Sequence, residues 1–210
     1  NACGERKGLL GSTGAVSKGS EQQHPEHHGL PIWSGSSVRR LRRCAMALAI
    51  ALLTISDTRT LAEDSSGDYL QQSLEAAGHQ LYQRSLCPDD RYRIRAELSR
   101  WIADPAVDVV ISSGGTGLTG RDGTPEAVAP LLDKTIDGFG ELFRVLSFET
   151  IGTSTLQSRC LAGVANGTFV FVLPGSLDAV TTAWNKLIRA QLDAETRPCN
   201  LAQLRERLRE

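Results

Sequence analysis

The chain has 210 residues, a length that predicts a single domain, with or without a tail, and that is ample for a well-buried core. Apolar residues make up 40% of the sequence and aromatic residues only 5%, as in a globular protein with few aromatic stacking platforms. The 23 basic and 24 acidic residues leave a net charge of −1, which argues against a nucleic-acid coat or an acidic tail protein.

Residues 1–43 differ from the rest of the chain in composition and charge. They are rich in Gly, Ser, Gln and His and show no hydrophobic periodicity, so we predict that they are disordered. They contain seven basic and three acidic residues, so that a tail of net charge +4 precedes a domain of net charge −5. We interpret the three histidines of this tail as solvated side chains and not as a metal-binding tract, because no companion ligands accompany them.

Met46 is the only methionine of the chain. Our hypothesis is that the functional protein begins near Met46, which divides the chain into a disordered basic extension over 1–45 and a folded domain over 46–210. An intact mass that included the whole extension would contradict this hypothesis.

The segment over 38–55 allows two interpretations. Four arginines followed by the apolar run Ala45–Ile55 look like the basic and apolar regions of a signal peptide. However, no small-x-small cleavage site follows, and the run is shorter than the roughly 20 residues that a membrane helix needs. We therefore favour a fully buried first strand of a parallel sheet over Leu48–Ile55, with a targeting segment as the alternative.

The cysteines are odd in number, widely spaced and without a C-x-x-C pair. This spacing argues against a zinc site or a disulfide framework, and it predicts reduced thiols in a cytoplasmic protein. The cysteines are Cys3, Cys44, Cys87, Cys160 and Cys199.

After the first strand, helix-like and strand-like segments alternate. This alternation predicts an α/β layered fold with a mostly parallel sheet. Right-handed crossovers then place the carboxyl ends of the strands, and the loops that follow them, on one rim. The predicted strands are Leu48–Ile55, Gln80–Leu86, Val107–Ser112 and Thr168–Leu173, and the predicted helices are Ser66–Ala77, one that opens at Pro88-Asp89-Asp90, one that begins at Thr124-Pro125-Glu126, Gly138–Thr150 and one from Ser176 to about Leu192.

Local signals predict where the helices begin and which faces they bury. We expect Ser66 to cap the first helix and Gly78 to end it. Thr124 is expected to cap a later helix, with Pro125 at the first helical position. In the helix over Gly138–Thr150, the residues expected to point inward are Phe139, Leu142, Phe143 and Leu146.

A glycine-rich loop over Gly114–Gly123 follows the third predicted strand. Its stretch from Gly115 to Gly120 matches G-x-G-x-x-G, the fingerprint of dinucleotide-binding proteins. The context argues against such a site, because the next helix begins only at Thr124 and no acidic residue ends a strand about twenty positions further on. A P-loop is excluded, since no G-K-[ST] follows the glycines.

The segment Ser112–Gly117 is expected to present hydroxyls and unobstructed backbone N–H groups. Such a concavity binds phosphate or another anion. The alternative is a glycine-rich turn that only reverses the chain. Asp122 favours the anion site, because a carboxylate beside a phosphate is repulsive unless a cation such as Mg²⁺ bridges them. Asp89 and Ser56 follow other predicted strands and are expected on the same rim, with helix capping and turn chemistry as their alternatives. Together these loops indicate nucleotide or phosphoryl chemistry without identifying it.

Several motifs occur together in an order that resembles a known family. They are Thr54-Ile-Ser-Asp57, Ser113-Gly-Gly-Thr-Gly117, Arg121-Asp-Gly-Thr-Pro-Glu126, Gly138-Phe-Gly-Glu141, Leu146-Ser147 and Leu173-Pro-Gly175. They resemble the MoaB/MogA family of molybdenum cofactor biosynthesis proteins. The stretches Gly138–Arg159 and Thr196–Asn200 are similar to the MoaB branch, and the resemblance covers about residues 47–200.

The resemblance implies a three-layer α/β sandwich with a mostly parallel central sheet, the molybdopterin-binding-like fold, assembled as a homotrimer or hexamer. It also implies molybdopterin adenylyltransferase activity, with molybdopterin and ATP as substrates, Mg²⁺ as cofactor and other proteins of the pathway as partners. No nucleic-acid or membrane partner is expected. Asp89 and Asp122 match the two functional aspartates, which are expected to hold Mg²⁺ and orient the triphosphate. Positions that match substrate contacts are Ser56, Ser113, Gly114, Gly115, Thr116, Gly117, Ser147, Gly175 and Ser176.

Gly123 departs from the commoner family pattern, in which a larger residue often precedes Thr-Pro, and a glycine there is expected to loosen the loop that holds Asp122. The presence of both aspartates favours catalysis over a second hypothesis, a non-catalytic molybdopterin-binding or scaffold protein of the same pathway. A third hypothesis is an α/β enzyme that acts on another phosphorylated substrate. A trimer would need an apolar subunit face, for which the candidates are Phe139, Leu142 and Phe143.

Overall fold

The structure is a computed structural model that describes residues 46–209. The predicted extension over 1–45, with its histidines and with Cys3 and Cys44, lies outside the described residues. The hypothesis that the protein begins near Met46 therefore stays a prediction.

A mixed six-stranded sheet forms the centre of the described part, in the order β2-β1-β3-β6-β5-β4. The first four strands of this order run parallel to one another, whereas β5 is antiparallel to β6 and β4 is antiparallel to β5. Every residue of β3 and β6 is buried, as expected for central strands that are covered on both faces. The strands are β1 (Ala49–Ile55), β2 (Gln80–Cys87), β3 (Val109–Ser113), β4 (Lys134–Thr135), β5 (Leu161–Ala165) and β6 (Thr168–Leu173).

The sequence predicted β1, β2, β3 and β6 but missed the antiparallel strands β4 and β5. Only Asn166 and Gly167 separate β5 from β6, and both have positive φ angles, 48° and 77°. An Asn-Gly pair in this conformation is the preferred two-residue connection of a β-hairpin. The pair was therefore the signal in the sequence that could have identified β5.

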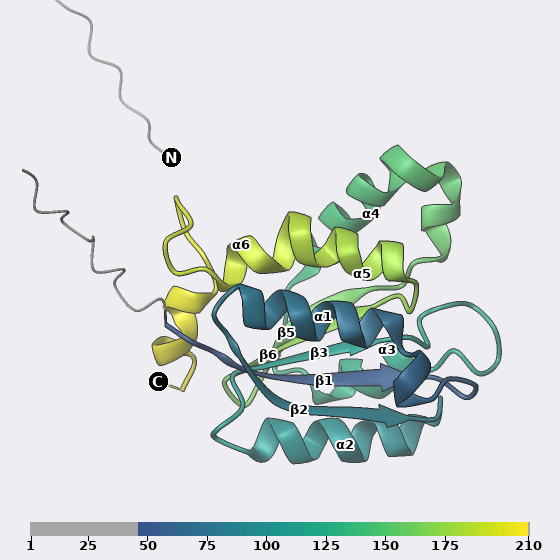
Figure 1. The fold of residues 1–210 in the computed structure, drawn as a ribbon, viewed down its shortest axis with the longest axis horizontal. Coiled ribbons are helices and arrows are strands. Elements are labelled where there is room, and N and C mark those ends of the chain that lie inside the picture. The colour runs from purple at the N-terminus through teal and green to yellow at the C-terminus, as the bar shows by residue number, and fades with distance from the viewer. Residues whose placement is uncertain (1–45, 210) are drawn as a thin grey trace, which may run out of the picture. The chain divides into compact units, whose positions relative to one another are not determined.

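Helices cover both faces of the sheet, which gives the three-layer α/β sandwich that the sequence predicted (Figure 1). Helices α1, α4, α5 and α6 share one hydrophobic core with the sheet, and α2 and α3 share the core of the opposite face. Within residues 46–209, no helix is both long and apolar enough to cross a membrane. The α-helices are α1 (Ser65–Ala76), α2 (Arg91–Ala103), α3 (Thr124–Val128), α4 (Asp137–Ile151), α5 (Leu177–Ala183) and α6 (Arg189–Leu192), with a π-helical turn over Trp184–Ile188 and 3₁₀ segments over Leu61–Glu63, Ala129–Leu131, Gly152–Gln157 and Ala202–Arg209.

Two predicted helix caps were wrong by one or two residues. Asp64, and not Ser66, caps α1, because its carboxylate accepts a hydrogen bond from the backbone N–H of Gly67 at 3.0 Å. Gly123 holds the cap position of α3, and Thr124 is the first helical residue. For α1, adjacent residues could also serve as caps, and contacts of Asp64 with β1 and β2 decide between them.

The inward face predicted for α4 is correct for Phe139 and Phe143 and wrong for Leu142. Both phenylalanines are buried, and Phe139 packs edge-to-face on Phe171 of β6 with ring centroids 5.3 Å apart. Leu142 is 55% exposed. Since α4 lies on the sheet with one face only, its other apolar residues point away from the core.

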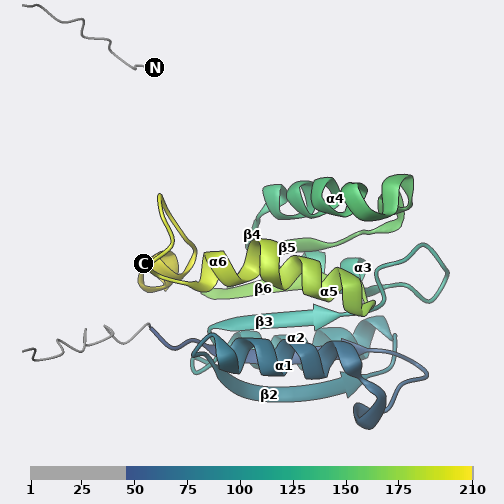
Figure 2. The same ribbon diagram turned by 45° about the horizontal axis from the view of Figure 1, so that its top comes forward.

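The carboxyl ends of the parallel strands lie at one edge of the sheet. Thr54 of β1 pairs with Ser113 of β3, which in turn pairs with Leu173 of β6, so the carboxyl ends of these strands are neighbours. The turn before α1 and the long loop after β3 lie at this edge (Figures 1 and 2). The loops that carry the predicted site residues therefore start from a common place.

Candidate active site

A cavity of about 410 Å³ opens at this edge of the sheet. Its walls come from the loops that follow β1, β3 and β6 and from the segment between α4 and β5. The volume falls within the range of about 300–1,000 Å³ that is usual for small-molecule sites. The predicted site residues that line the cavity are Ser56, Gly114, Gly115, Thr116, Gly117, Asp122, Gly175 and Ser176.

The glycine loop begins with two residues in a conformation that favours glycine. Gly114 has a φ of 109° and Gly115 a φ of 63°, and side chains strain the backbone in this region. A Cβ on Gly114 would also lie 2.1 Å from the carbonyl oxygen of Ile55, at the end of β1. The loops after β1 and β3 therefore approach each other backbone to backbone, which brings them to a single cavity.

Gly115→Ala is expected to destabilise this loop, whereas Gly120→Ala in the same loop is expected to be tolerated. A Cβ at Gly115 would lie 2.3 Å from Oγ1 of Thr124 and 2.5 Å from Oδ2 of Asp89, but one at Gly120 has no such neighbour within 4 Å. We expect the free energy of unfolding to fall by about 1–3 kcal/mol for Gly115→Ala and by less than about 0.5 kcal/mol for Gly120→Ala. Chemical denaturation measures both, and equal stabilities would contradict the prediction.

Asp89 lies between β2 and α2, with its side chain against the glycine loop. Its backbone N–H donates to Oδ1 of Asp57 at 3.1 Å, and its own Oδ1 accepts a hydrogen bond from the N–H of Gly123 at 3.3 Å. Burial, followed by the negative charges of Asp122 and Asp57, raises the pKa of Asp89 despite the Gly123 hydrogen bond. A carboxylate in such unfavourable surroundings is typical of a functional site, and a bound cation would stabilise its charged form.

Asp122 belongs to the glycine loop itself. Its Oδ2 accepts hydrogen bonds from the backbone N–H of Thr119 at 2.8 Å and from the Thr119 hydroxyl at 2.5 Å. The Thr119 hydroxyl contributes most to holding the pKa of Asp122 below its ordinary value, with further contributions from backbone N–H groups and the charge of Arg159, while partial burial acts against them. The two aspartates therefore differ, because Asp122 stays ionised to lower pH than usual and Asp89 takes up a proton at higher pH than usual.

The oxygen atoms around Gly115 suit a hard cation such as Mg²⁺. Oγ1 of Thr124 is buried without a hydrogen-bond partner, and it approaches the same face of Gly115 as Oδ2 of Asp89. Mg²⁺ takes oxygen ligands and is usually held by one or two carboxylates together with water and phosphate oxygens. Over residues 46–209, no group of three or more His, Cys, Asp or Glu could hold a metal ion. Asp89 and Thr124 offer two oxygen ligands that fit part of a Mg²⁺ shell, and substrate phosphates would supply others.

Three arginines for which the sequence predicted no role lie in the loops around the cavity. Arg121 forms an ion pair with Asp57, through Nε at 3.1 Å and Nη2 at 2.7 Å. Arg59 lines the cavity and donates from Nη1 to the carbonyl oxygen of Gly175 at 3.1 Å. Arg159 donates from Nε to the carbonyl oxygen of Gly117 in the glycine loop at 2.8 Å. Basic residues in or next to the predicted rim loops were the signal in the sequence, and the charge of Arg59, which lines the cavity, favours an anionic ligand.

Ser56 and Ser176 fix the conformations of their own loops. Oγ of Ser56 accepts hydrogen bonds from the backbone N–H groups of Thr58 at 3.3 Å and Arg59 at 3.1 Å. Oγ of Ser176 accepts one from the N–H of Ala179 at 3.3 Å and so caps α5. Because both hydroxyls act as acceptors in these contacts, their O–H groups can donate to a ligand in the cavity.

Three predicted site residues do not line the cavity: Asp89, which lies behind the glycine loop against Gly115, and the serines Ser113 and Ser147. Ser113 is the last residue of β3 and is buried between its strand neighbours Thr54 and Leu173. Ser147 is buried on α4, where its backbone carbonyl accepts a hydrogen bond from the hydroxyl of Thr150 at 3.0 Å. The structure does not bring either residue to the cavity lining, so substrate contacts by these two serines stay predictions.

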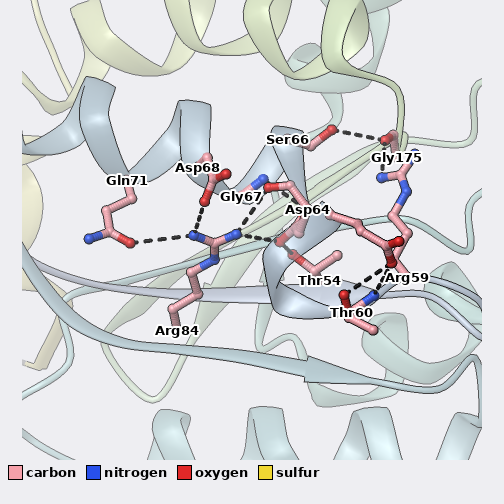
Figure 3. A network of polar contacts seen from close by, with 11 residues as sticks. Thr54, Arg59, Thr60, Asp64, Ser66, Gly67, Asp68, Gln71, Arg84 and Gly175 are labelled. Atoms are coloured by element: carbon pink, nitrogen blue, oxygen red, sulfur yellow. Dashed lines mark hydrogen bonds and ion pairs between the residues drawn. The ribbon is translucent and has the colours of Figure 1, made fainter.

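A buried polar network joins β1, β2 and the start of α1 (Figure 3). Asp64 is 0% exposed and accepts hydrogen bonds from Oγ1 of Thr54 at 2.6 Å, the N–H of Gly67 at 3.0 Å and Nη2 of Arg84 at 2.9 Å. Burial alone would raise the pKa of Asp64, but these hydrogen bonds and the charge of Arg84 outweigh it and lower the pKa. The network therefore holds the carboxylate ionised and fixes the beginning of α1.

The same helix start is tied to the cavity through the carbonyl oxygen of Gly175. Ser66, in the first turn of α1, donates to this oxygen from its hydroxyl at 3.1 Å, and Arg59 donates to it from the loop after β1. Figure 3 shows both side chains directed at Gly175. The buried network thus positions a residue of the cavity wall as well as α1.

Three comparisons relate the chain to known proteins. Residues 51–194 match the family MoCF_biosynth, described as "Probable molybdopterin binding domain". The chain is 55% identical over 151 residues to Molybdenum cofactor biosynthesis protein B of Escherichia coli strain K12, which covers 72% of this chain and 89% of that protein. A crystal structure of a Molybdenum cofactor biosynthesis protein B has a TM-score of 0.71 at 40% identity, over 78% of this chain and 97% of the other. The tungsten cofactor synthesizing protein MoaB from Pyrococcus furiosus has a TM-score of 0.66 at 31% identity, over 79% and 99%.

Proposed function

The chain belongs to the MoCF_biosynth family of molybdenum cofactor biosynthesis proteins, and from this premise we propose that it is a molybdopterin adenylyltransferase. The proposed reaction converts molybdopterin and Mg-ATP into adenylyl-molybdopterin and pyrophosphate. Family membership follows from the comparisons, whereas the adenylyl transfer is an inference from the motifs and from the chemistry of the site.

The observation that carries the proposal is the convergence of Asp89 and Asp122 on one glycine loop beside the cavity. Oδ2 of Asp89 lies 2.5 Å from the place of a Cβ on Gly115, and Oδ2 of Asp122 lies 2.7 Å from that of a Cβ on Gly117. Two carboxylates beside a glycine loop suit a complex of a cation with a polyphosphate, because the cation offsets the repulsion between carboxylate and phosphate.

In the proposed reaction, an oxygen of the terminal phosphate of molybdopterin attacks the α-phosphorus of ATP. A P–O bond forms there, the bond from the α-phosphorus to the oxygen that bridges to the β-phosphate breaks, and that oxygen leaves with pyrophosphate. Asp89, Asp122 and Thr124 would hold Mg²⁺, which when bound neutralises charge on the triphosphate. The glycine loop and Arg59 would bind phosphate oxygens. The rate of the reaction would then be raised by positioning the substrates and neutralising their charge, without a covalent intermediate on the protein.

Release of pyrophosphate from Mg-ATP in the presence of molybdopterin tests this proposal. We expect release that depends on molybdopterin. Binding of molybdopterin without release would instead identify a non-catalytic binding or scaffold protein of the pathway. Thermal stabilisation by other phosphorylated ligands, but not by molybdopterin or ATP, would identify an enzyme with a different substrate.

We further propose that the chain forms a homotrimer or hexamer through an apolar face of α4. Clusters of exposed large apolar side chains are typical of protein–protein interfaces. Of the subunit-face candidates named from the sequence, only Leu142 is exposed, because Phe139 and Phe143 pack into the core. The exposed apolar residues of α4 recur at three-residue intervals and are Leu142, Val145, Phe148 and Ile151, each at least 50% exposed.

Phe148→Glu is expected to dissociate this assembly, because a charge in an apolar contact loses its hydration without gaining a partner. Tyr92→Glu is the matched control, since Tyr92 is 74% exposed on α2, at the opposite face of the sheet. Light scattering coupled to size-exclusion chromatography should show a smaller species for Phe148→Glu only. An unchanged mass for Phe148→Glu would contradict the assignment of this face.

A further inference from the structure

We propose that Arg159 is a positioning residue that holds Asp89 and Asp122 in place through two peptide groups of the glycine loop. This inference rests on the function proposed above for the two aspartates. Arg159 lies between the 3₁₀ segment Gly152–Gln157 and β5, and its side chain is 27% exposed. It therefore reaches the loop from a part of the chain that carries neither aspartate.

The guanidinium of Arg159 binds three carbonyl groups of the glycine loop. Nε donates to the carbonyl oxygens of Thr116 at 3.3 Å and Gly117 at 2.8 Å, and Nη2 donates to that of Asp122 at 2.9 Å. The remaining nitrogen, Nη1, forms an ion pair with Glu126 of α3. A planar guanidinium presents five N–H donors in a fixed arrangement, which the single ammonium group of a lysine cannot reproduce.

The peptide group between Asp122 and Gly123 lies between Arg159 and Asp89. Its carbonyl accepts the hydrogen bond from Nη2 of Arg159, and its N–H donates to Oδ1 of Asp89 at 3.3 Å. In a planar trans peptide the C=O and N–H groups point in opposite directions, so a single orientation makes both contacts. Without Arg159 this peptide would be free to turn, and Asp89 would lose its backbone donor.

The peptide group between Thr116 and Gly117 lies between Arg159 and Asp122 in the same way. Its carbonyl accepts a hydrogen bond from Nε of Arg159. The carboxylate of Asp122 lies against Gly117, because its Oδ2 is 2.7 Å from the place of a Cβ on that residue, and the Gly117 N–H is among the groups that lower the pKa of Asp122. Each aspartate is therefore stabilised by the N–H of a peptide whose carbonyl Arg159 binds.

Arg159→Met tests the inference, with Glu126→Gln as the matched control. The control removes the ion pair at Nη1 and leaves the three carbonyl contacts of Arg159 in place. The first measurement is independent of the reaction, because carboxyl-carbon NMR titration reports the pKa values of Asp89 and Asp122 directly. Arg159→Met should raise both pKa values, because each carboxylate loses a hydrogen bond to its charged form and Asp122 also loses the nearby charge of Arg159, and Glu126→Gln should leave both near their wild-type values.

The second measurement is the steady-state kinetics of adenylylation. Arg159→Met should lower kcat by about ten- to a hundredfold, the usual effect of losing a group that orients metal-binding carboxylates. The KM for ATP should change less, because Arg159 touches the loop and not the substrate. Added guanidinium ion should restore part of the lost kcat, and Glu126→Gln should retain nearly full activity.

Unchanged pKa values and unchanged kcat in a folded Arg159→Met variant would overturn the inference, as would an equal loss in Glu126→Gln. If Arg159→Met does not fold, Arg159→Lys replaces it, because lysine keeps the charge but reaches fewer carbonyls. Wild-type pKa values and kcat in Arg159→Lys would then overturn the inference, and raised pKa values with a lowered kcat would support it. A wild-type chain that does not adenylylate molybdopterin would contradict the proposed function, whereas the NMR titration would still decide the role of Arg159.

Discussion

Alanine in place of Asp89 or Asp122 is expected to lower molybdopterin adenylylation by at least about a hundredfold, the effect of removing one charge-stabilising group from an active site. Each variant loses a carboxylate that would help to hold Mg²⁺ at the triphosphate. Both variants should still fold. Burial and like charges already disfavour the ionised form of Asp89, and Asp122 lies in a surface loop. Pyrophosphate release and circular dichroism measure the two outcomes.

Asp178→Ala is the matched control for both aspartates. Asp178 is an exposed residue of α5, two positions after Ser176 of the cavity wall, so its replacement removes an acidic group from the same edge of the sheet. The control should retain full activity. Full turnover in Asp89→Ala and in Asp122→Ala would refute the roles proposed for both residues.

Asp64→Ala is expected to reduce the free energy of unfolding by about 3–5 kcal/mol, which is the usual cost of breaking a buried ion pair from one side. The substitution leaves the charge of Arg84 largely buried, and it removes the acceptor for the hydroxyl of Thr54 and for the N–H of Gly67. The start of α1 loses its cap at the same time. Denaturation by urea would measure the loss.

Asp68→Ala provides the comparison, because Asp68 also pairs with Arg84, at 2.6 Å, but is 51% exposed. Its removal should cost less than about 1 kcal/mol, as for other exposed ion pairs. The contribution of Asp64 should also depend on pH. Since its folded pKa is lowered, the contribution is complete above the ordinary pKa near 3.8 and is lost as the pH falls through the folded value. Similar losses of unfolding free energy in Asp64→Ala and Asp68→Ala would contradict the importance of burial.

The strands β1, β3 and β6 were predictable because they are mostly apolar runs that are buried on both faces. The end of α1 was predictable for a comparable reason, since Gly78 has a φ of 88° and glycine adopts that conformation freely. β5 was missed because Gly163 lowers its strand propensity. That glycine is required by close packing, because a Cβ on it would lie 2.5 Å from the carbonyl oxygen of Lys134 in β4.

The cap of α1 shows where local sequence stops being decisive. Asp64, Ser65 and Ser66 are consecutive residues that can each cap a helix. The choice of Asp64 follows from Thr54 and Arg84, which approach it from β1 and β2. Contacts of this kind join distant parts of the chain, and the local pattern does not contain them.

The candidate site, too, could be predicted from the sequence only in part. The positions of Asp89 and Asp122 at one edge could be predicted, because the carboxyl ends of parallel strands meet there. The contacts of Arg159 could not, since Arg159 belongs to the segment that leads into the antiparallel strand β5. The surroundings of Gly123 could not be predicted either. In the structure its N–H donates to Asp89, and its φ of −120° is one that other residues also adopt. That Gly123 loosens the loop stays a prediction.

Adenylyl-molybdopterin, detected by mass spectrometry after incubation of the chain with molybdopterin and Mg-ATP, is the most direct measure of the proposed function. We expect this product together with an equal amount of pyrophosphate, and at least about a hundredfold less of both from Asp122→Ala. Saturable binding of molybdopterin by the wild-type chain, with ATP left intact and no adenylylated product, would contradict the proposal.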